Sequence, residues 1–354
     1  MRYPKTLHVL MTDIGETMSP LDHRLAPLQQ WTMSALHDVL APDTAVLRDD
    51  ALASWVPVSG DASFRRYFRI YFEGHSYIIM DAPPEKESVE PFVDIAQRLL
   101  KAGLRAPIIV AQQQEQGFLL LEDLGDEMLK SLLNEASGQH LMDAVLPVLA
   151  TMASSCDITG LPDYSPIKLK EELALFPDWY LQQHLGLSLS HDEAELWHQL
   201  AQTLIDNAIA QPQVFVHRDF HSCNLHQLAD GDIGVIDFQD AVCGPLTYDL
   251  ASWLWDRYIT WPRSQLEIWM LQARQKLAPQ VDEATWIRWC DLMGLQRNLK
   301  IVGIFARLHY RDNKEGYLEM TPRFAHYISA VLSLYPELAS SRVMLDKWLA
   351  MVKK

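Results

Sequence analysis

Hydrophobic and polar positions follow two different periods along the chain, and the period changes near residue 125. Before that point, short apolar runs predict strands over residues 51–58, 64–72, 77–80, 106–112 and 117–121. Apolar residues at helical spacing predict two helices beside these strands and a mostly helical remainder. The predicted helices span 21–40, 88–102, 126–135, 138–156, 167–185, 190–210, 246–260, 263–277, 283–310 and 321–353, the last with a break near Pro336.

Strands first and helices later predict an α+β fold with two lobes. The boundary is expected at the loop that begins with Glu122, after the last predicted strand. An N-terminal lobe would then span residues 1–122 and a helical C-terminal lobe residues 123–354.

One apolar and acidic segment, residues 214–239, interrupts the helical half. A short apolar strand is followed by His217-Arg218-Asp219, then by four residues and Asn224, and a second apolar strand ends at Asp237. This spacing is typical of protein-kinase-like phosphotransferases, in which one carboxylate acts as a base toward a hydroxyl while an amide and a second carboxylate hold Mg²⁺. A hairpin over 214–239 would bring the three oxygens together. A zinc site is the local alternative, with His217, His221 and Cys223 as ligands, although no CxxC accompanies them.

The N-terminal half offers candidate contacts for a nucleotide. The small residues between the first two strands suit a flap over phosphates, because backbone N–H groups can approach closely there; a plain surface hairpin is the alternative. Arg66 is the only charge on an apolar strand face, so we expect it to pair with a carboxylate or to reach the phosphates. In a kinase-like architecture the backbone near Glu122 and Leu124 would pair with adenine. The flap residues are Ser59, Gly60, Asp61, Ala62 and Ser63.

Composition narrows the class of protein. The chain has 354 residues, of which 49% are hydrophobic and 21% charged, as in soluble globular proteins. A net charge of −16 argues against a nucleic-acid or anionic-membrane partner. The four scattered cysteines form no disulfide framework, no apolar run reaches the ~20 residues of a membrane span, and no signal peptide is evident, so we expect a cytoplasmic protein. Residues 1–20 are expected to contribute little to function.

With these residues in place, the chain resembles the aminoglycoside-phosphotransferase/choline-kinase-like family. The resemblance is densest over residues 214–255, and it is strongest to the bacterial kinases that phosphorylate the anomeric hydroxyl of N-acetylmuramate and N-acetylglucosamine in cell-wall recycling. The segments that carry it are GDASFRRYFR (60–69), MDAPPEKE (80–87), LLEDLGD (120–126), HRDFHSCNL (217–225), IDFQDA (236–241) and GPLTYDLASWLWD (244–256).

The resemblance implies a bilobal protein-kinase-like fold, a monomer, and a sugar kinase that uses ATP and Mg²⁺. Asp219 would be the catalytic base, and Asn224 and Asp237 would hold the metal. His217 and Asp249 would brace the catalytic loop. The candidate substrate-binding residues are Gln239, Asp240, Tyr248 and Arg307, with Arg297 as a second cation for a substrate carboxylate.

One departure from the kinase pattern concerns the third strand, which carries no lysine to hold the phosphates. Either Arg65, Arg66 or Lys86 would supply that charge instead, or the site would rely more on Mg²⁺ and backbone donors. We reject a degenerate kinase because the base and both metal-binding residues are retained. Two alternatives stay open: a kinase of aminoglycosides or other amino alcohols, for which Asp240 could bind a cationic substrate, and a nucleotide-binding regulator without turnover.

Overall fold

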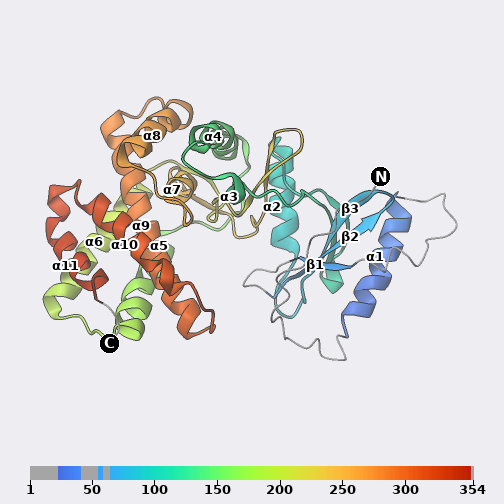
Figure 1. Cartoon of the computed structure of the whole chain (residues 1–354), viewed down its shortest axis with the longest axis horizontal. Coiled ribbons are helices and arrows are strands. Elements are labelled where there is room, and N and C mark those ends of the chain that lie inside the picture. Colours follow the sequence, from blue (N-terminus) through green and yellow to red (C-terminus); the bar gives the residue numbers. More distant parts are fainter. Residues whose placement is uncertain (1–22, 41–54, 59–63, 352–354) are drawn as a thin grey trace, which may run out of the picture. The chain divides into compact units, whose positions relative to one another are not determined.

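The computed structural model describes residues 23–40, 55–58 and 64–351, and the chain divides into two compact units (Figure 1). The first unit comprises Met1–Ser88 and Val110–Glu122, and the second comprises Val89–Ile109 and Asp123–Lys354. The expected flap residues 59–63 lie outside the described residues, as do residues 1–20.

Helix α2 (Glu90–Lys101) groups with the second unit, whereas the sequence placed it in an N-terminal lobe over residues 1–122. Its contacts explain the difference. The ring of Phe92 lies 4.8 Å from that of Phe238, and the Arg98 guanidinium donates to the carbonyl of Asp157 at 2.8 Å. These contacts place α2 in the second unit, although it lies between two strands of the first unit along the chain.

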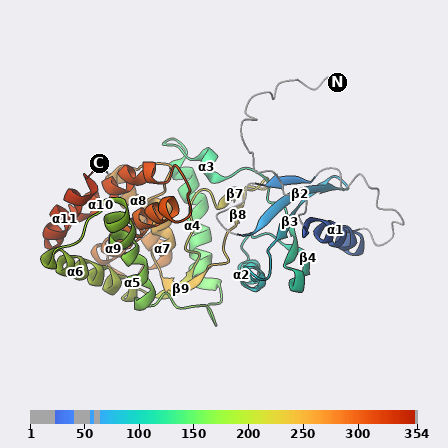
Figure 2. The ribbon, with the colours of Figure 1, turned by 90° about the horizontal axis from the view of Figure 1, so that it is seen from below.

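The first unit is built on a five-stranded sheet in the order β1-β2-β3-β5-β4, covered by helix α1 (Figure 2). Its core includes Leu28 and Leu36 from α1, together with Ile70, Ile79 and Leu120 from the sheet. Alternate positions of the strands supply these residues, as expected for a sheet with one covered face. The elements are α1 (Leu25–Leu40), β1 (Val56–Val58), β2 (Arg66–Phe72), β3 (His75–Asp81), β4 (Ile109–Gln113), η2 (Gln114–Gln116) and β5 (Phe118–Glu122).

The second unit packs its helices around α9 (Glu283–Tyr310), which contacts at least seven other helical segments of the described chain. Gly303 allows one close approach, because a Cβ there would collide with the backbone of Leu175. Among the described helices, none has both the length and the apolar composition needed to cross a lipid bilayer. The other helical elements are α3 (Leu129–Leu132), α4 (Gly138–Ser155), α5 (Pro166–Leu175), η3 (Phe176–His184), α6 (His191–Ile209), α7 (Tyr248–Leu254), α8 (Arg263–Leu277), η4 (Leu318–Met320), α10 (Thr321–Leu332), η5 (Pro336–Leu338) and α11 (Ala339–Leu349).

The predicted hairpin over residues 214–239 is wrong. Strand β6 (Gln213–Val216) pairs antiparallel with β9 (Val242–Pro245), and β7 (Leu225–Gln227) pairs with β8 (Ile233–Val235). The sequence analysis identified neither β7 nor β9, because their short sequences, LHQ and VCGP, show neither an apolar run nor an alternating pattern. The catalytic segment therefore consists of one loop after β6 and a tight hairpin of β7 and β8.

Candidate active site

The loop that follows β6 carries His217, Arg218 and Asp219, and it has an unusual backbone. Arg218 has a φ of 76°, a left-handed conformation that residues other than glycine rarely adopt. The buried carboxylate of Asp249, at the start of α7, accepts the backbone N–H of His217 at 2.7 Å and that of Arg218 at 3.0 Å. Two hydrogen bonds to one carboxylate thus stabilise the bend that presents Asp219.

The ring of His217 contributes further contacts to this loop. Its Nδ1 accepts the backbone N–H of Asp219 at 3.3 Å, and its Nε2 lies 2.9 Å from the carbonyl oxygen of Ile236, to which it donates. Both ring nitrogens are therefore used by the backbone, which argues against the alternative of a zinc ligand. Burial raises the pKa of Asp249 to about 6, and the hydrogen bonds and the nearby His217 oppose that rise, so the carboxylate is ionised at neutral pH.

Asn224 and Asp237 meet beside this loop. Asn224 directly precedes β7 and Asp237 is the second residue after β8, so pairing of the two strands brings the side chains together. Asn224 Nδ2 lies 3.1 Å from Asp237 Oδ2 and 3.0 Å from the backbone oxygen of Asp219. Gln239 Nε2 donates to Asp237 Oδ1 at 2.8 Å. The sequence thus identified three residues that the tertiary structure places in one cluster.

This cluster fits a magnesium ion by the chemistry of its donors. Mg²⁺ prefers oxygen ligands and usually keeps several waters or phosphate oxygens, so one carboxylate and one amide from the protein suffice. Asp237 supplies the carboxylate, and a rotation of the Asn224 amide presents its Oδ1. No group of three His, Cys, Asp or Glu side chains within the described ranges has a metal-binding arrangement, which disfavours a site built from protein ligands alone.

Asp219 opens into a cavity of about 180 Å³, which we call the Asp219 pocket. Asp219 retains exposed surface on this side even though many side chains surround it. Burial raises its pKa, but the positive charges of Lys300 and Arg297 more than compensate, so the pKa is lowered and the carboxylate stays ionised. The pocket is lined by Asp219, His221, Arg257, Arg297, Ile301, Ile304, Phe305, Leu308, Tyr317 and Phe324.

Known proteins are similar in sequence to this chain over most of its length. The model of the "Phosphotransferase enzyme family" matches residues 54–284. An N-acetylmuramate/N-acetylglucosamine kinase of Pseudomonas putida is 41% identical over 329 residues, which cover 90% of this chain and 94% of the relative. The chain belongs to the phosphotransferase enzyme family. A kinase of the same name from Pseudomonas aeruginosa is 39% identical and covers 90% of this chain and 95% of its own length.

Two solved structures have a similar fold. An ethanolamine kinase of Plasmodium vivax superposes with a TM-score of 0.59 at 11% identity, over 93% of this chain and 98% of that structure. A thermostable mutant of an aminoglycoside phosphotransferase, in a ternary complex with ADP and hygromycin B, gives a TM-score of 0.52 at 16% identity, over 77% and 92%. The expected α+β, protein-kinase-like fold class and the family resemblance are confirmed.

The residues expected to bind the nucleotide are spread over both units of this phosphotransferase. Arg66 lies on β2 directly opposite Asp81, and its Nε donates to Asp81 Oδ2 at 3.0 Å. The sequence analysis expected Arg66 either to pair with a carboxylate or to reach the phosphates, and the structure shows the carboxylate pair. Arg24 Nε binds the other oxygen of Asp81 at 2.9 Å. Glu122 ends β5 in the first unit and Leu124 belongs to the second, both half-buried. Their roles toward a nucleotide stay predictions.

The expected substrate residues do not gather around Asp219. Gln239 and Asp240 line a second cavity, of about 530 Å³, and Tyr248 is buried with its hydroxyl oxygen 3.0 Å from Lys300 Nζ. Arg307 is half-buried on α9 and does not belong to the described lining of the Asp219 pocket. Arg297 does, and it is 5% exposed. Of the two cations considered from the sequence, the structure favours Arg297.

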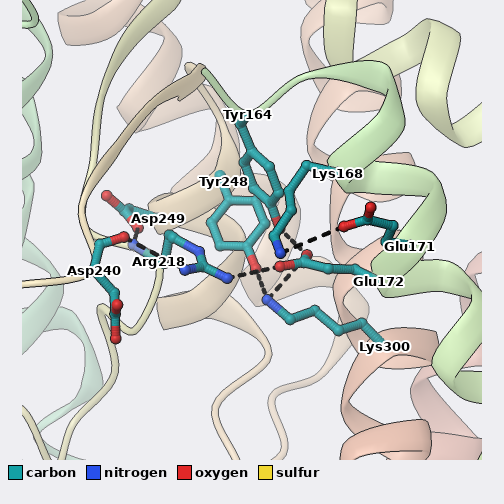
Figure 3. Close-up of polar contacts among 9 residues, drawn as sticks. All are labelled: Tyr164, Lys168, Glu171, Glu172, Arg218, Asp240, Tyr248, Asp249 and Lys300. Atoms are coloured by element: carbon teal, nitrogen blue, oxygen red, sulfur yellow. Dashed lines mark hydrogen bonds and ion pairs between the residues drawn. The ribbon is translucent and has the colours of Figure 1, made fainter. Parts of the chain in front are cut away.

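The sequence analysis missed Glu172, a buried carboxylate next to the catalytic loop (Figure 3). Glu172 Oε1 lies 2.7 Å from Arg218 Nη2, and Glu172 Oε2 lies 3.1 Å from Lys300 Nζ. Burial raises the pKa of Glu172, but Lys300 and Arg218 hold it below its ordinary value. A signal was present: Glu172 shares a helix face with Leu169 and Phe176, where a charge requires a partner.

Proposed function

We propose that the chain is an ATP- and Mg²⁺-dependent kinase that phosphorylates the anomeric hydroxyl of N-acetylmuramate and N-acetylglucosamine, in the cytoplasm, as a step of peptidoglycan recycling. The observation that carries the proposal is the match to relatives of this name along nearly their whole length, 94% in the Pseudomonas putida protein. The ADP in the ternary complex of the structurally similar aminoglycoside phosphotransferase supports a nucleotide as the phosphate donor.

The chain's own residues have separable roles in this reaction. Asp219, ionised and open to its pocket, orients the sugar hydroxyl and accepts its proton. Asn224 and Asp237 hold the metal, which when bound neutralises charge on the phosphates. Asp249 and His217 stabilise the loop and so fix the carboxylate relative to the acceptor.

Arg297 is proposed to recognise the carboxylate by which N-acetylmuramate differs from N-acetylglucosamine. It lines the same pocket as Asp219, and its guanidinium makes no hydrogen bond or close ion pair with the described residues. The second cation of the pocket, Arg257, instead donates to Nε2 of His221. A buried guanidinium beside a cavity suits a carboxylate, because the fork of N–H donors matches its two oxygens.

Replacing Arg297 by glutamine should shift selectivity between the two sugars. We expect kcat/KM for N-acetylmuramate to fall about 10- to 100-fold more than that for N-acetylglucosamine, the loss that a charged hydrogen bond predicts. Steady-state kinetics on both sugars give the ratio of their kcat/KM values. An indirect effect of the substitution on Asp219 would change both values equally and leave this ratio unchanged. Arg307→Gln, on the same helix outside the pocket lining, is the matched control and should leave the ratio unchanged. Equal losses on both sugars would exclude this role of Arg297.

A panel of acceptors tests the function itself. The purified protein is incubated with ATP and Mg²⁺ and with N-acetylmuramate, N-acetylglucosamine, 1-O-methyl-N-acetylglucosamine, kanamycin or choline, and the product phosphate is located by phosphorus NMR. We expect phosphorylation at position 1 of the two reducing sugars. Turnover of the 1-O-methyl sugar would contradict the anomeric position. Turnover of kanamycin or choline alone would favour the amino-alcohol alternative, and ATP binding without any turnover would favour a regulator.

A further inference from the structure

The contacts of Glu172 join three separate elements to the catalytic loop. Glu172 lies on α5 and is 5% exposed. One of its oxygens accepts from Arg218 at 2.7 Å, and the other accepts from Lys300 of α9 at 3.1 Å and from the hydroxyl of Tyr164 (Figure 3). Lys300 in turn donates to the hydroxyl of Tyr248, the first residue of α7, at 3.0 Å. Three side-chain donors, from Arg218, Lys300 and Tyr164, thus meet at the single carboxylate of Glu172. Arg218 also donates to the backbone oxygen of Asp240 at 3.5 Å.

The left-handed backbone of Arg218 indicates that a side chain is needed at this position. At a φ of 76° a non-glycine residue is strained, whereas glycine would adopt the same conformation freely. The arginine side chain contacts Glu172, and its guanidinium lies 5.7 Å from the centre of the Tyr164 ring. Because Arg218 directly precedes Asp219, contacts that fix the side chain of Arg218 also restrict the backbone of Asp219.

Lys300 extends the same cluster to the acceptor side. It lies three residues after Arg297 on α9, so both side chains share one face of that helix. Arg297 lines the Asp219 pocket, and Lys300 is 8% exposed. Glu172 therefore connects the loop that carries Asp219 with the helix that forms a wall of the pocket.

We infer that Glu172 is a positioning residue for phosphoryl transfer: by holding Arg218 and Lys300 together, it fixes the Asp219 carboxylate relative to the acceptor in the pocket. Glu172 touches no reacting group and acts through its two cations. The inference rests on the proposed function, because the rate it concerns is that of the sugar kinase. Misplacing a catalytic group by about 1 Å costs on the order of 100-fold in rate, which sets the scale of the effect.

The test compares two buried carboxylates in the full-length protein. Glu172→Gln keeps the shape of the side chain and removes its charge; we expect kcat for N-acetylglucosamine to fall about 10- to 100-fold while KM changes less than about threefold. The matched control is Asp291→Asn on α9. Asp291 is equally buried and pairs with Arg263 at 2.9 Å and with the Tyr335 hydroxyl at 2.7 Å, away from the catalytic loop.

Thermal unfolding is measured alongside the kinetics. Both variants should lower Tm. Glu172→Gln leaves Arg218 and Lys300 without their carboxylate, and Asp291→Asn weakens the pairing of the half-buried Arg263, which keeps its contact with Glu267 at 2.7 Å. The control should keep kcat within about twofold of wild type. A Glu172→Gln variant with wild-type kcat, or equal losses of kcat in the two variants, would overturn the inference. If the wild type phosphorylates no sugar, the proposed function itself is wrong. That outcome differs from a failure of the Glu172 inference, in which the wild type is active and the Glu172→Gln variant is equally active.

A second pair of variants keeps the inference testable if Glu172→Gln does not fold. Arg218→Gly suits the left-handed backbone and removes only the side chain, so we expect a folded protein with kcat reduced about 10-fold or more. Arg218→Lys, which can still reach Glu172 with a positive charge, should recover part of that loss. In the double variant Glu172→Gln/Arg218→Gly, kcat should be no lower than in the worse single variant. Independent, multiplying losses would contradict action through Arg218.

Discussion

Replacing Asp219 by asparagine is expected to lower kcat by about 10²- to 10⁴-fold with little change in Tm. The amide cannot accept the proton of the sugar hydroxyl, whereas the ionised carboxylate, whose pKa is lowered by Lys300, can. The fold should survive because the hydrogen bonds from His221 and Asn224 to this residue reach its backbone oxygen and not its side chain. Release of ADP measured with saturating N-acetylglucosamine gives the rate.

The control for this change is Asp230→Asn. Asp230 is an exposed carboxylate in the turn between β7 and β8, and it pairs with Arg105 at 2.6 Å. Because it lies at the surface, its replacement should leave kcat within about twofold of wild type. An Asp219→Asn variant that retains more than a tenth of the wild-type rate would rule out a base at this position.

Replacing Asp237 by asparagine should produce the second large effect, a fall in kcat of about 10³-fold at ordinary magnesium concentration. The change removes the only carboxylate of the Asn224–Asp237 cluster, so a bound metal would be held by neutral oxygens alone. Asparagine tolerates the left-handed backbone of this residue, whose φ is 61°, so the loop should keep its conformation. Rates measured across a series of Mg²⁺ concentrations test the cause.

The expected signature of lost metal binding is a partial recovery of the rate as Mg²⁺ rises, with a half-saturating concentration well above that of the wild type. Asp232→Asn, which changes an exposed carboxylate of the nearby turn, should show the wild-type dependence. If Asp237→Asn has the wild-type magnesium dependence as well, Asp237 is not a ligand and the metal site must lie elsewhere.

The sequence by itself determined most of the helices and the chemistry of the catalytic loop. Long amphipathic segments carry many repeats of one period, so α4, α6, α8 and α9 begin and end within one or two residues of prediction. The spacing of Asp219, Asn224 and Asp237 is equally local information, because short loops and one hairpin connect them. The α+β order of elements followed from the same patterns.

Only the tertiary structure decided which strands pair and which charges meet. Strand β6 pairs with β9, 26 or more residues away along the chain. Strands of three or four residues are too short for their sequence to predict which strand they pair with. The cluster of Tyr164, Glu172, Arg218, Tyr248 and Lys300 draws on five separate segments. Its members are ordinary residues in sequence, and they become a site because burial forbids an unpaired charge and packing brings the partners within reach.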